Sequence, residues 1–145
     1  INGKKNIDIE NKVLKKNKKI KIFYTKYKAQ NIDEFKNKKV IAFAGIGHPE
    51  NFFNLLKDNK INVTEEIKFP DHHKYSEKEL ENLINKTKKN NDILITTEKD
   101  YFRIIKNHKK NINYLKIKTE IENRNQFIDE IKKIIWRLLN IFLNS

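Results

Sequence analysis

Three short polar segments hold most of the side chains that could do chemistry, and the densest is segment 69–75 (FPDHHKY). In it Asp71 stands beside His72 and His73. Imidazole changes charge near neutral pH and can serve as an acid, a base or an orienting group, and Asp71 could fix a histidine tautomer. A metal site would need further ligands, because adjacent histidine side chains diverge. The structural alternative is a surface turn that leads to Ser76.

Segment 44–50 (AGIGHPE) places Gly45 and Gly47 at a turn from a strand into a helix. Two glycines let the backbone approach a ligand closely, and the following helix N-terminus favours anions. The functional interpretation is a cradle for a phosphate or a sugar. The alternative is a tight turn that requires positive φ. Asn51 stands where a dinucleotide fingerprint would have its third glycine, so this pattern alone favours the turn.

Segment 96–100 (TTEKD) brings hydroxyls, carboxylates and an amine together after a strand. Thr97, Glu98 and Lys99 could hold a phosphate, a ribose or a neighbouring domain. The alternative is helix capping by Thr97, followed by a local charge cluster that includes Asp100.

The elements that must position these segments alternate between strands and helices. We expect strands at 20–27, 39–46, 62–69, 92–97 and 112–117, and helices that begin near Pro49, after the Ser76 capping box, after Thr97 and near Asn125. This order predicts an α/β fold, a Rossmann-like three-layer domain with a mostly parallel sheet. In such sheets ligands lie beyond the carboxyl ends of the strands, where all three polar segments fall. Without a repeat or linker we expect one domain over 1–145, with 1–19 as an edge ribbon or a partly mobile segment.

Composition excludes several classes of protein. The chain has no cysteine, which rules out disulfides and thiolate metal sites, and no apolar run long enough to span a membrane or serve as a signal peptide. The net charge of +13 could attract nucleic acid or an anionic membrane surface. The abundance of Lys, Asn and Ile, whose codons are AT-rich, favours compositional drift instead. Because the chain begins at Ile1 and contains no methionine, we expect a fragment.

Taken together, the three segments resemble one known family. The order FAGIG-x-P-x-x-FF, FPDHH-x-Y and TTEKD is similar to that of the tetraacyldisaccharide 4'-kinases, over roughly residues 20–115. His48 stands where the family usually has Asn, and this departure puts little in doubt. The resemblance implies a kinase of two α/β domains with its active site in the cleft between them, of which this chain would be the C-terminal domain.

The resemblance also implies where the cofactors bind. In this family the N-terminal domain carries the P-loop for ATP and Mg²⁺ and an acidic residue that activates the acceptor hydroxyl. This chain has three glycines and no Gly-x-x-x-x-Gly-Lys-Ser/Thr motif. We therefore expect a fragment that is inactive alone, needs the missing N-terminal domain as its partner and has no metal site of its own.

The expected substrate is a lipid A precursor, tetraacyldisaccharide 1-phosphate, phosphorylated at its 4'-hydroxyl. By motif position the family's catalytic histidine falls on His72, with Asp71 as its orienting partner. We expect the other site residues to bind substrate or nucleotide: Gly45, Gly47, His73, Thr97, Glu98 and Lys99. The expected location is the cytoplasmic face of the bacterial inner membrane, in peripheral contact with its anionic surface.

Two alternatives stay open on the sequence alone. One is a basic α/β module that binds nucleic acid, although we expect no specific nucleic-acid partner, and the only hint is the mixture of tyrosines and lysines at 24–28. The other is a different nucleotide- or sugar-binding Rossmann-like domain without a kinase partner.

Overall fold

The computed structural model describes residue 1 and residues 3–143, and these divide into two compact units. One unit is Ala29–Lys118, and the other comprises the chain before it and the chain after it. Whether the two units fold as the single domain expected from the sequence stays a prediction. All three polar segments lie in the unit Ala29–Lys118, which is described first.

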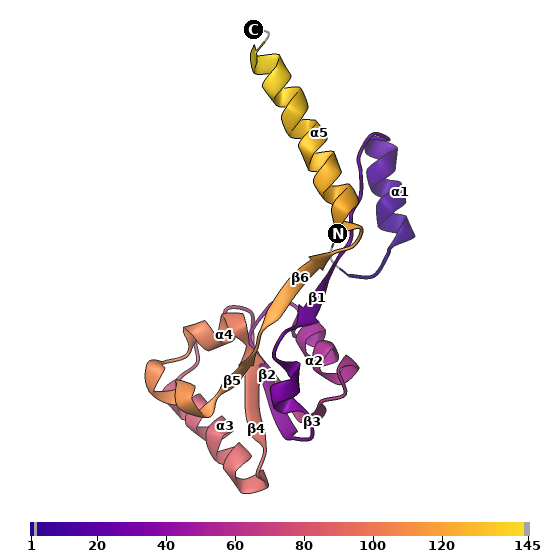
Figure 1. Cartoon of the computed structure of the whole chain (residues 1–145). Helices are drawn as coiled ribbons and strands as arrows, with labels where there is room; N and C mark the ends of the chain where they lie inside the picture. Colours follow the sequence, from indigo (N-terminus) through magenta and orange to yellow (C-terminus); the bar gives the residue numbers. More distant parts are fainter. Residues whose placement is uncertain (2, 144–145) are drawn as a thin grey trace. The chain divides into compact units, whose positions relative to one another are not determined.

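This unit is built on a four-stranded sheet (Figure 1). Its strands are β2 (Lys39–Ala44), β3 (Asn62–Lys68), β4 (Ile93–Thr97) and β5 (Asn113–Leu115). Their order is β3-β2-β4-β5, and each neighbouring pair is parallel. The parallel sheet expected from the alternating elements is therefore confirmed.

Strand β2 is buried on both faces, as its continuous apolar run predicts. Val40, Ala42 and Ala44 pack on one face against α2 (Pro49–Asp58). Ile41 and Phe43 pack on the other face against α3 (Glu77–Asn90). A sheet covered by helices on both faces is the expected three-layer arrangement.

The connections make β2 a switch point in the topology. The chain runs from β2 through α2 to β3 on one side, and then through α3 to β4 on the other side of β2. Loops that leave such strands diverge to opposite faces, and ligands of open α/β sheets bind in the crevice between them. Two of the three polar segments follow β2 and β4, and the third follows β3 beside them.

Three short segments complete the unit. Helix α4 (Glu98–Arg103) follows β4 directly, and the 3-10 turns η1 (Ile32–Phe35) and η2 (Lys106–Asn111) precede β2 and β5. Helix α4 ends at Arg103, and Ile104 after it adopts an extended backbone.

The other unit contains α1 (Ile7–Lys16), α5 (Arg124–Leu143) and most of the strands β1 (Thr25–Ala29) and β6 (Ile117–Ile121), which pair as a separate two-stranded sheet. The edge ribbon expected over 1–19 is wrong for α1. The Asn6 side chain accepts the Ile9 N–H, and acidic and basic residues occupy the first and last turns of α1, respectively. The strand expected at 112–117 is instead divided between β5 and β6. Among the described helices, none is long and apolar enough to cross a membrane.

Candidate active site at the strand carboxyl ends

The three polar segments meet at the backbone of Gly45, directly after β2. Its N–H donates to Asp100 Oδ2 at 3.0 Å, which ties the first segment to the third. Its carbonyl accepts the His72 N–H at 3.1 Å and a bond from Arg103 Nη1 at 3.1 Å. The N–H and the carbonyl of one residue, Gly45, therefore join the ends of β2, β3 and β4, and the order of the strands explains why these segments can meet.

Gly45 is buried and has no room for a side chain. A Cβ there would lie 2.8 Å from Tyr75 Oη, 3.1 Å from His73 Cβ and 3.2 Å from the Pro70 carbonyl oxygen. Gly47 is exposed, and its Cβ would lie 3.4 Å from Asp71 Oδ2, which is an ordinary contact. Neither glycine has a positive φ. The turn therefore needs glycine at position 45 because of close packing. It does not need a positive φ, which the sequence had suggested as the reason.

Asp100 is the buried charge of this site, with no exposed surface. Besides the Gly45 N–H it accepts the Thr97 hydroxyl at 2.7 Å and Arg103 Nη1 at 3.2 Å. A carboxylate is tolerated in a core only when it is paired and hydrogen-bonded, and both conditions hold here. Sequence reasoning placed Asp100 in a local charge cluster and overlooked Arg103. Their i, i+3 spacing on a helix was the signal that could have linked them.

His72 has a left-handed backbone, with φ of 59°, and its side chain is 71% exposed. Its N–H is shared between the Gly45 carbonyl and Asp71 Oδ1, the latter at 2.9 Å. The ring Nε2 lies 3.8 Å from Asp71 Oδ2, too far for a hydrogen bond. Asp71 therefore orients the peptide of His72 directly and its ring only loosely. The imidazole faces solvent, where a substrate could reach it.

His73 has a different environment from its neighbour. Its ring stacks on Phe69 with centroids 4.8 Å apart, and Nε2 lies 3.1 Å from Glu79 Oε1. Glu79 also accepts the Ser76 N–H and hydroxyl in the capping box of α3. These bonds lower the pKa of Glu79, and those to Ser76 have the largest effect. His73 thus joins the loop to α3, and its predicted role in ligand binding stays a prediction.

The side chain of Tyr75 lies beside Gly45, with its hydroxyl 2.8 Å from the position that a Cβ on Gly45 would occupy. Its ring packs edge-on against Phe43, Phe69 and His73, and its buried hydroxyl lies near Asp100 without a well-formed hydrogen bond to any described residue. Burial and the negative charge of nearby Asp100 raise the pKa of Tyr75 above its usual range. The hydroxyl therefore stays protonated throughout the physiological range of pH.

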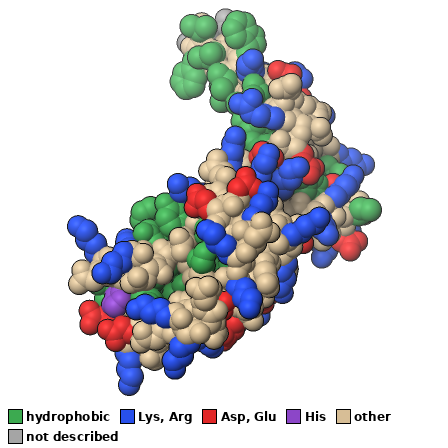
Figure 2. All heavy atoms as spheres, turned by 60° about the horizontal axis from the view of Figure 1, so that its bottom comes forward, with side chains coloured by type: hydrophobic (Ala, Val, Ile, Leu, Met, Phe, Trp, Pro, Cys, Tyr) green, Lys and Arg blue, Asp and Glu red, His purple; other side chains and the backbone are tan. Residues whose placement is uncertain are grey.

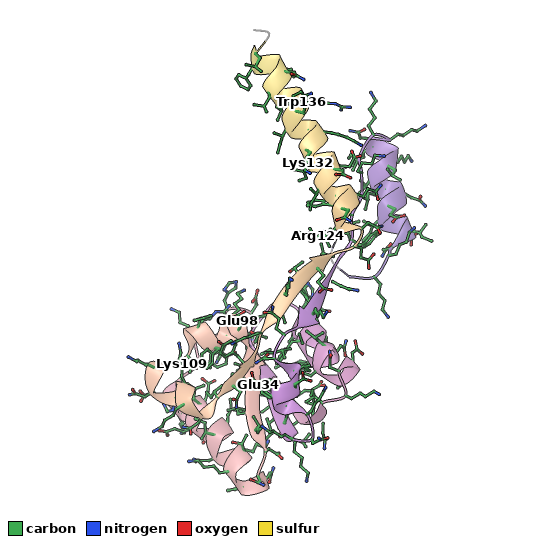
Figure 3. The ribbon with its side chains drawn as sticks, in the orientation of Figure 1. Glu34, Glu98, Lys109, Arg124, Lys132 and Trp136 are labelled. Carbon is green, nitrogen blue, oxygen red and sulfur yellow. The ribbon has the colours of Figure 1, made fainter. Side chains whose placement is uncertain are left out.

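The remaining predicted residues lie at the start of α4. Thr97 is the N-cap residue, and its hydroxyl accepts the Asp100 N–H at 3.1 Å, so the alternative of helix capping by Thr97 is confirmed. Glu98 is half-buried and Lys99 is exposed; Figure 3 shows Glu98 on α4. Ligand-binding roles for Gly47, Thr97, Glu98 and Lys99 stay predictions.

The donor set does not fit ATP or Mg²⁺. Across residue 1 and residues 3–143, no group of three or more His, Asp or Glu side chains could hold a metal ion. The loop after β2 contains neither the lysine nor the hydroxyl residue that a P-loop uses to hold phosphates and Mg²⁺. That ATP and Mg²⁺ bind mainly to residues outside this chain stays a prediction.

Fold and site together define a Rossmann-like α/β domain with its polar loops gathered at a switch point. The family model for tetraacyldisaccharide-1-P 4'-kinase matches residues 2–135. The tetraacyldisaccharide 4'-kinase of Pelagibacter ubique (strain HTCC1062) is 36% identical over 129 residues, which cover 88% of this chain and 41% of that protein. That of Rickettsia akari (strain Hartford) is 40% identical over 105 residues, or 72% of this chain and 31% of that protein.

The chain therefore belongs to the tetraacyldisaccharide 4'-kinase family, as its three motifs predicted. It spans less than half the length of the curated relatives that it matches. A crystal structure of LpxK from Aquifex aeolicus in complex with ATP is similar over 85% of this chain and 40% of that chain, with 27% identity and a TM-score of 0.49.

Proposed function

We propose that this chain is the C-terminal part of an ATP-dependent kinase that phosphorylates the 4'-hydroxyl of a tetraacyldisaccharide 1-phosphate in lipid A biosynthesis. Family membership supports the reaction. The observation that carries the role of this chain is the exposed imidazole of His72, held by its backbone at the point where three strand ends meet. ATP supplies the phosphoryl group and, with Mg²⁺, binds mainly to residues outside this chain.

Within that reaction we assign His72 to the acceptor hydroxyl. Phosphoryl transfer depends mostly on positioning and charge stabilisation. A solvent-facing imidazole on a fixed backbone can bond to the attacking hydroxyl and to the acidic residue contributed by the rest of the protein. Asp71 supports this arrangement by accepting the His72 N–H at 2.9 Å.

The test uses the complete protein encoded with this chain, supplied with ATP, Mg²⁺ and tetraacyldisaccharide 1-phosphate. We expect the wild type to form the 4'-phosphate and His72→Ala to lose about 10²–10⁴-fold in turnover, as for a positioned acid–base group. His108→Ala, on η2, is the matched control and should keep wild-type turnover. A loss of less than about threefold in His72→Ala would remove this role, and the 145-residue chain alone should form no product.

We propose that the protein acts at the cytoplasmic face of the bacterial inner membrane, in peripheral contact with anionic lipid. The support is the net charge of +13. Figure 2 shows Lys and Arg side chains scattered over the visible face. A spread of charge favours a loose electrostatic attraction to a surface over a shaped groove.

One observation favours the alternative of nucleic-acid binding. The Tyr101 and Tyr114 rings lie 4.4 Å apart, and Lys109 Nζ lies 5.1 Å from the centroid of Tyr101 and 5.6 Å from that of Phe102. Phe102 is 67% exposed, and Figure 3 labels Lys109 on η2. Aromatic rings beside a cation can stack on bases. Salt-dependent binding of single-stranded DNA that is weakened by Phe102→Ala but not by Phe142→Ala would support this candidate.

A further inference from the structure

We propose that Asp100 and Arg103 are positioning residues that hold the backbone of His72 through the carbonyl of Gly45. This inference rests on the proposed function, because it gives His72 its task. The contacts form a continuous path. Asp100 Oδ1 accepts Arg103 Nη1 at 3.2 Å, the same nitrogen donates to the Gly45 carbonyl at 3.1 Å, and that carbonyl accepts the His72 N–H at 3.1 Å.

Asp100 fixes the Gly45 peptide from its other side as well. Its Oδ2 accepts the Gly45 N–H at 3.0 Å and the Thr97 hydroxyl at 2.7 Å. The carboxylate lies on the first turn of α4 and is fully buried, so its position is tied to that of the helix. The polar groups on both sides of Gly45 are thus bonded to one rigid element, which makes its carbonyl a fixed acceptor for His72.

His72 needs such support because its backbone is unfavourable by itself. A residue with a Cβ and φ of 59° persists only when its surroundings hold it there. Two described bonds do so, from its N–H to the Gly45 carbonyl and to Asp71 Oδ1. The ring Nε2 lies 3.8 Å from Asp71 Oδ2, beyond hydrogen-bond distance, so the position of the ring depends mainly on that of the backbone. If the hydrogen bond from the His72 N–H to the Gly45 carbonyl were lost, the imidazole would no longer be held next to the acceptor hydroxyl.

The chemistry of Arg103 suits this role. Its guanidinium presents several donors in a fixed fork, and one nitrogen joins a carboxylate and a peptide carbonyl. Its Nη2 is buried and makes no hydrogen bond to the residues that the structure describes, so the second nitrogen adds packing to the contact made by Nη1. A lysine would supply a single flexible charge and could replace only part of this contact.

The decisive experiment is a double-mutant cycle of Arg103→Ala with His72→Ala in the complete protein, assayed for 4'-phosphate formation. We expect Arg103→Ala to lower kcat by about ten- to hundredfold, the scale of a misplaced catalytic group, with the KM for ATP within about twofold. In the His72→Ala background it should lower kcat no further, because residues that act as one unit are not additive. Arg103→Lys should recover part of the loss, and Arg137→Ala on α5 is the matched arginine control.

A second measurement is amide hydrogen exchange in the complete protein. We expect amide hydrogen exchange of His72 to speed up at least about tenfold in Arg103→Ala, while the Leu80 amide in α3 keeps its protection, which shows that the fold persists. An unchanged His72 amide would overturn the positioning inference. So would an equal loss of kcat from Arg103→Ala with and without His72.

These outcomes separate the two proposals. If His72→Ala lowers turnover but Arg103→Ala acts independently of it, the proposed function stands and the positioning inference fails. If the wild type forms no 4'-phosphate, or His72→Ala matches it, the role of His72 in the proposed function fails, and the positioning inference fails with it as a statement about catalysis.

Discussion

Gly45→Ala offers a quantitative test of the close packing at the site. The new Cβ would lie 2.8 Å from the buried Tyr75 hydroxyl and 3.2 Å from the Pro70 carbonyl oxygen, and real Cβ contacts essentially never fall below 3.0 Å. Overpacking of this kind costs about 1–3 kcal/mol. Replacing glycine also reduces the entropy of the unfolded chain, which offsets about 0.4–1 kcal/mol. We therefore expect a net loss of about 1–2 kcal/mol in the free energy of unfolding.

The shortest contact can be removed by a second substitution. Tyr75→Phe deletes a buried hydroxyl that makes no well-formed hydrogen bond to the described residues, so by itself it should be neutral or stabilising. In the Gly45→Ala background it should recover about 1 kcal/mol, a coupling within the usual range for residues in contact. Recovery should be incomplete, because His73 Cβ still lies 3.1 Å from the new methyl group.

The assay is urea unfolding of the chain followed by far-UV circular dichroism, with the slope m compared between variants. Gly47→Ala is the matched control in the same turn, because its Cβ meets only Asp71 at an ordinary distance. It should lie within about 0.5 kcal/mol of the wild type. A Gly45→Ala variant as stable as Gly47→Ala, or strict additivity with Tyr75→Phe, would refute the reasoning.

Three further outcomes are expected. The raised pKa of Tyr75 keeps it protonated in the folded state after it ionises in the unfolded state, so above about pH 10 the wild type should lose up to about 1.4 kcal/mol per pH unit more than Tyr75→Phe in pH-dependent urea unfolding. Ser76→Ala removes the N-cap of α3 and should cost about 1 kcal/mol of stability at neutral pH. The bonds to Ser76 lower the pKa of Glu79, and the stability that they contribute is lost as the pH falls through the pKa of Glu79 in the folded protein, so the stability of Ser76→Ala should fall less steeply with acid than that of the wild type. Identical acid unfolding curves would contradict this. The chain should sediment with vesicles that contain anionic lipid at low salt and dissociate at about 1 M salt; binding that salt leaves unchanged would argue against electrostatic attraction.

Much of the fold follows from local patterns in the sequence. The apolar run of β2 between polar ends, Pro49 at the first turn of α2 and the Ser76–Glu79 capping box each place an element within about two residues of its observed bounds. Of the two alternatives expected for residues 1–19, an edge ribbon or a partly mobile segment, the ribbon is wrong over Ile7–Lys16, where the scattered hydrophobic residues hid the capped helix α1. A single strand was predicted at 112–117. The structure divides it, because β5 pairs with β4 whereas β6 pairs with β1, and the sequence does not show these partners.

The motifs identified the family and the three loops by sequence alone, since residue types and order suffice for a resemblance. Only the tertiary structure decided how the loops are used. It separated the exposed ring of His72 from the stacked ring of His73, although the two are adjacent and of one type. It buried Asp100 against Gly45, 55 residues away, because β2 and β4 are neighbours in the sheet. Local propensities encode helices and strands, but a contact between distant residues depends on strand order, which no short stretch of sequence specifies.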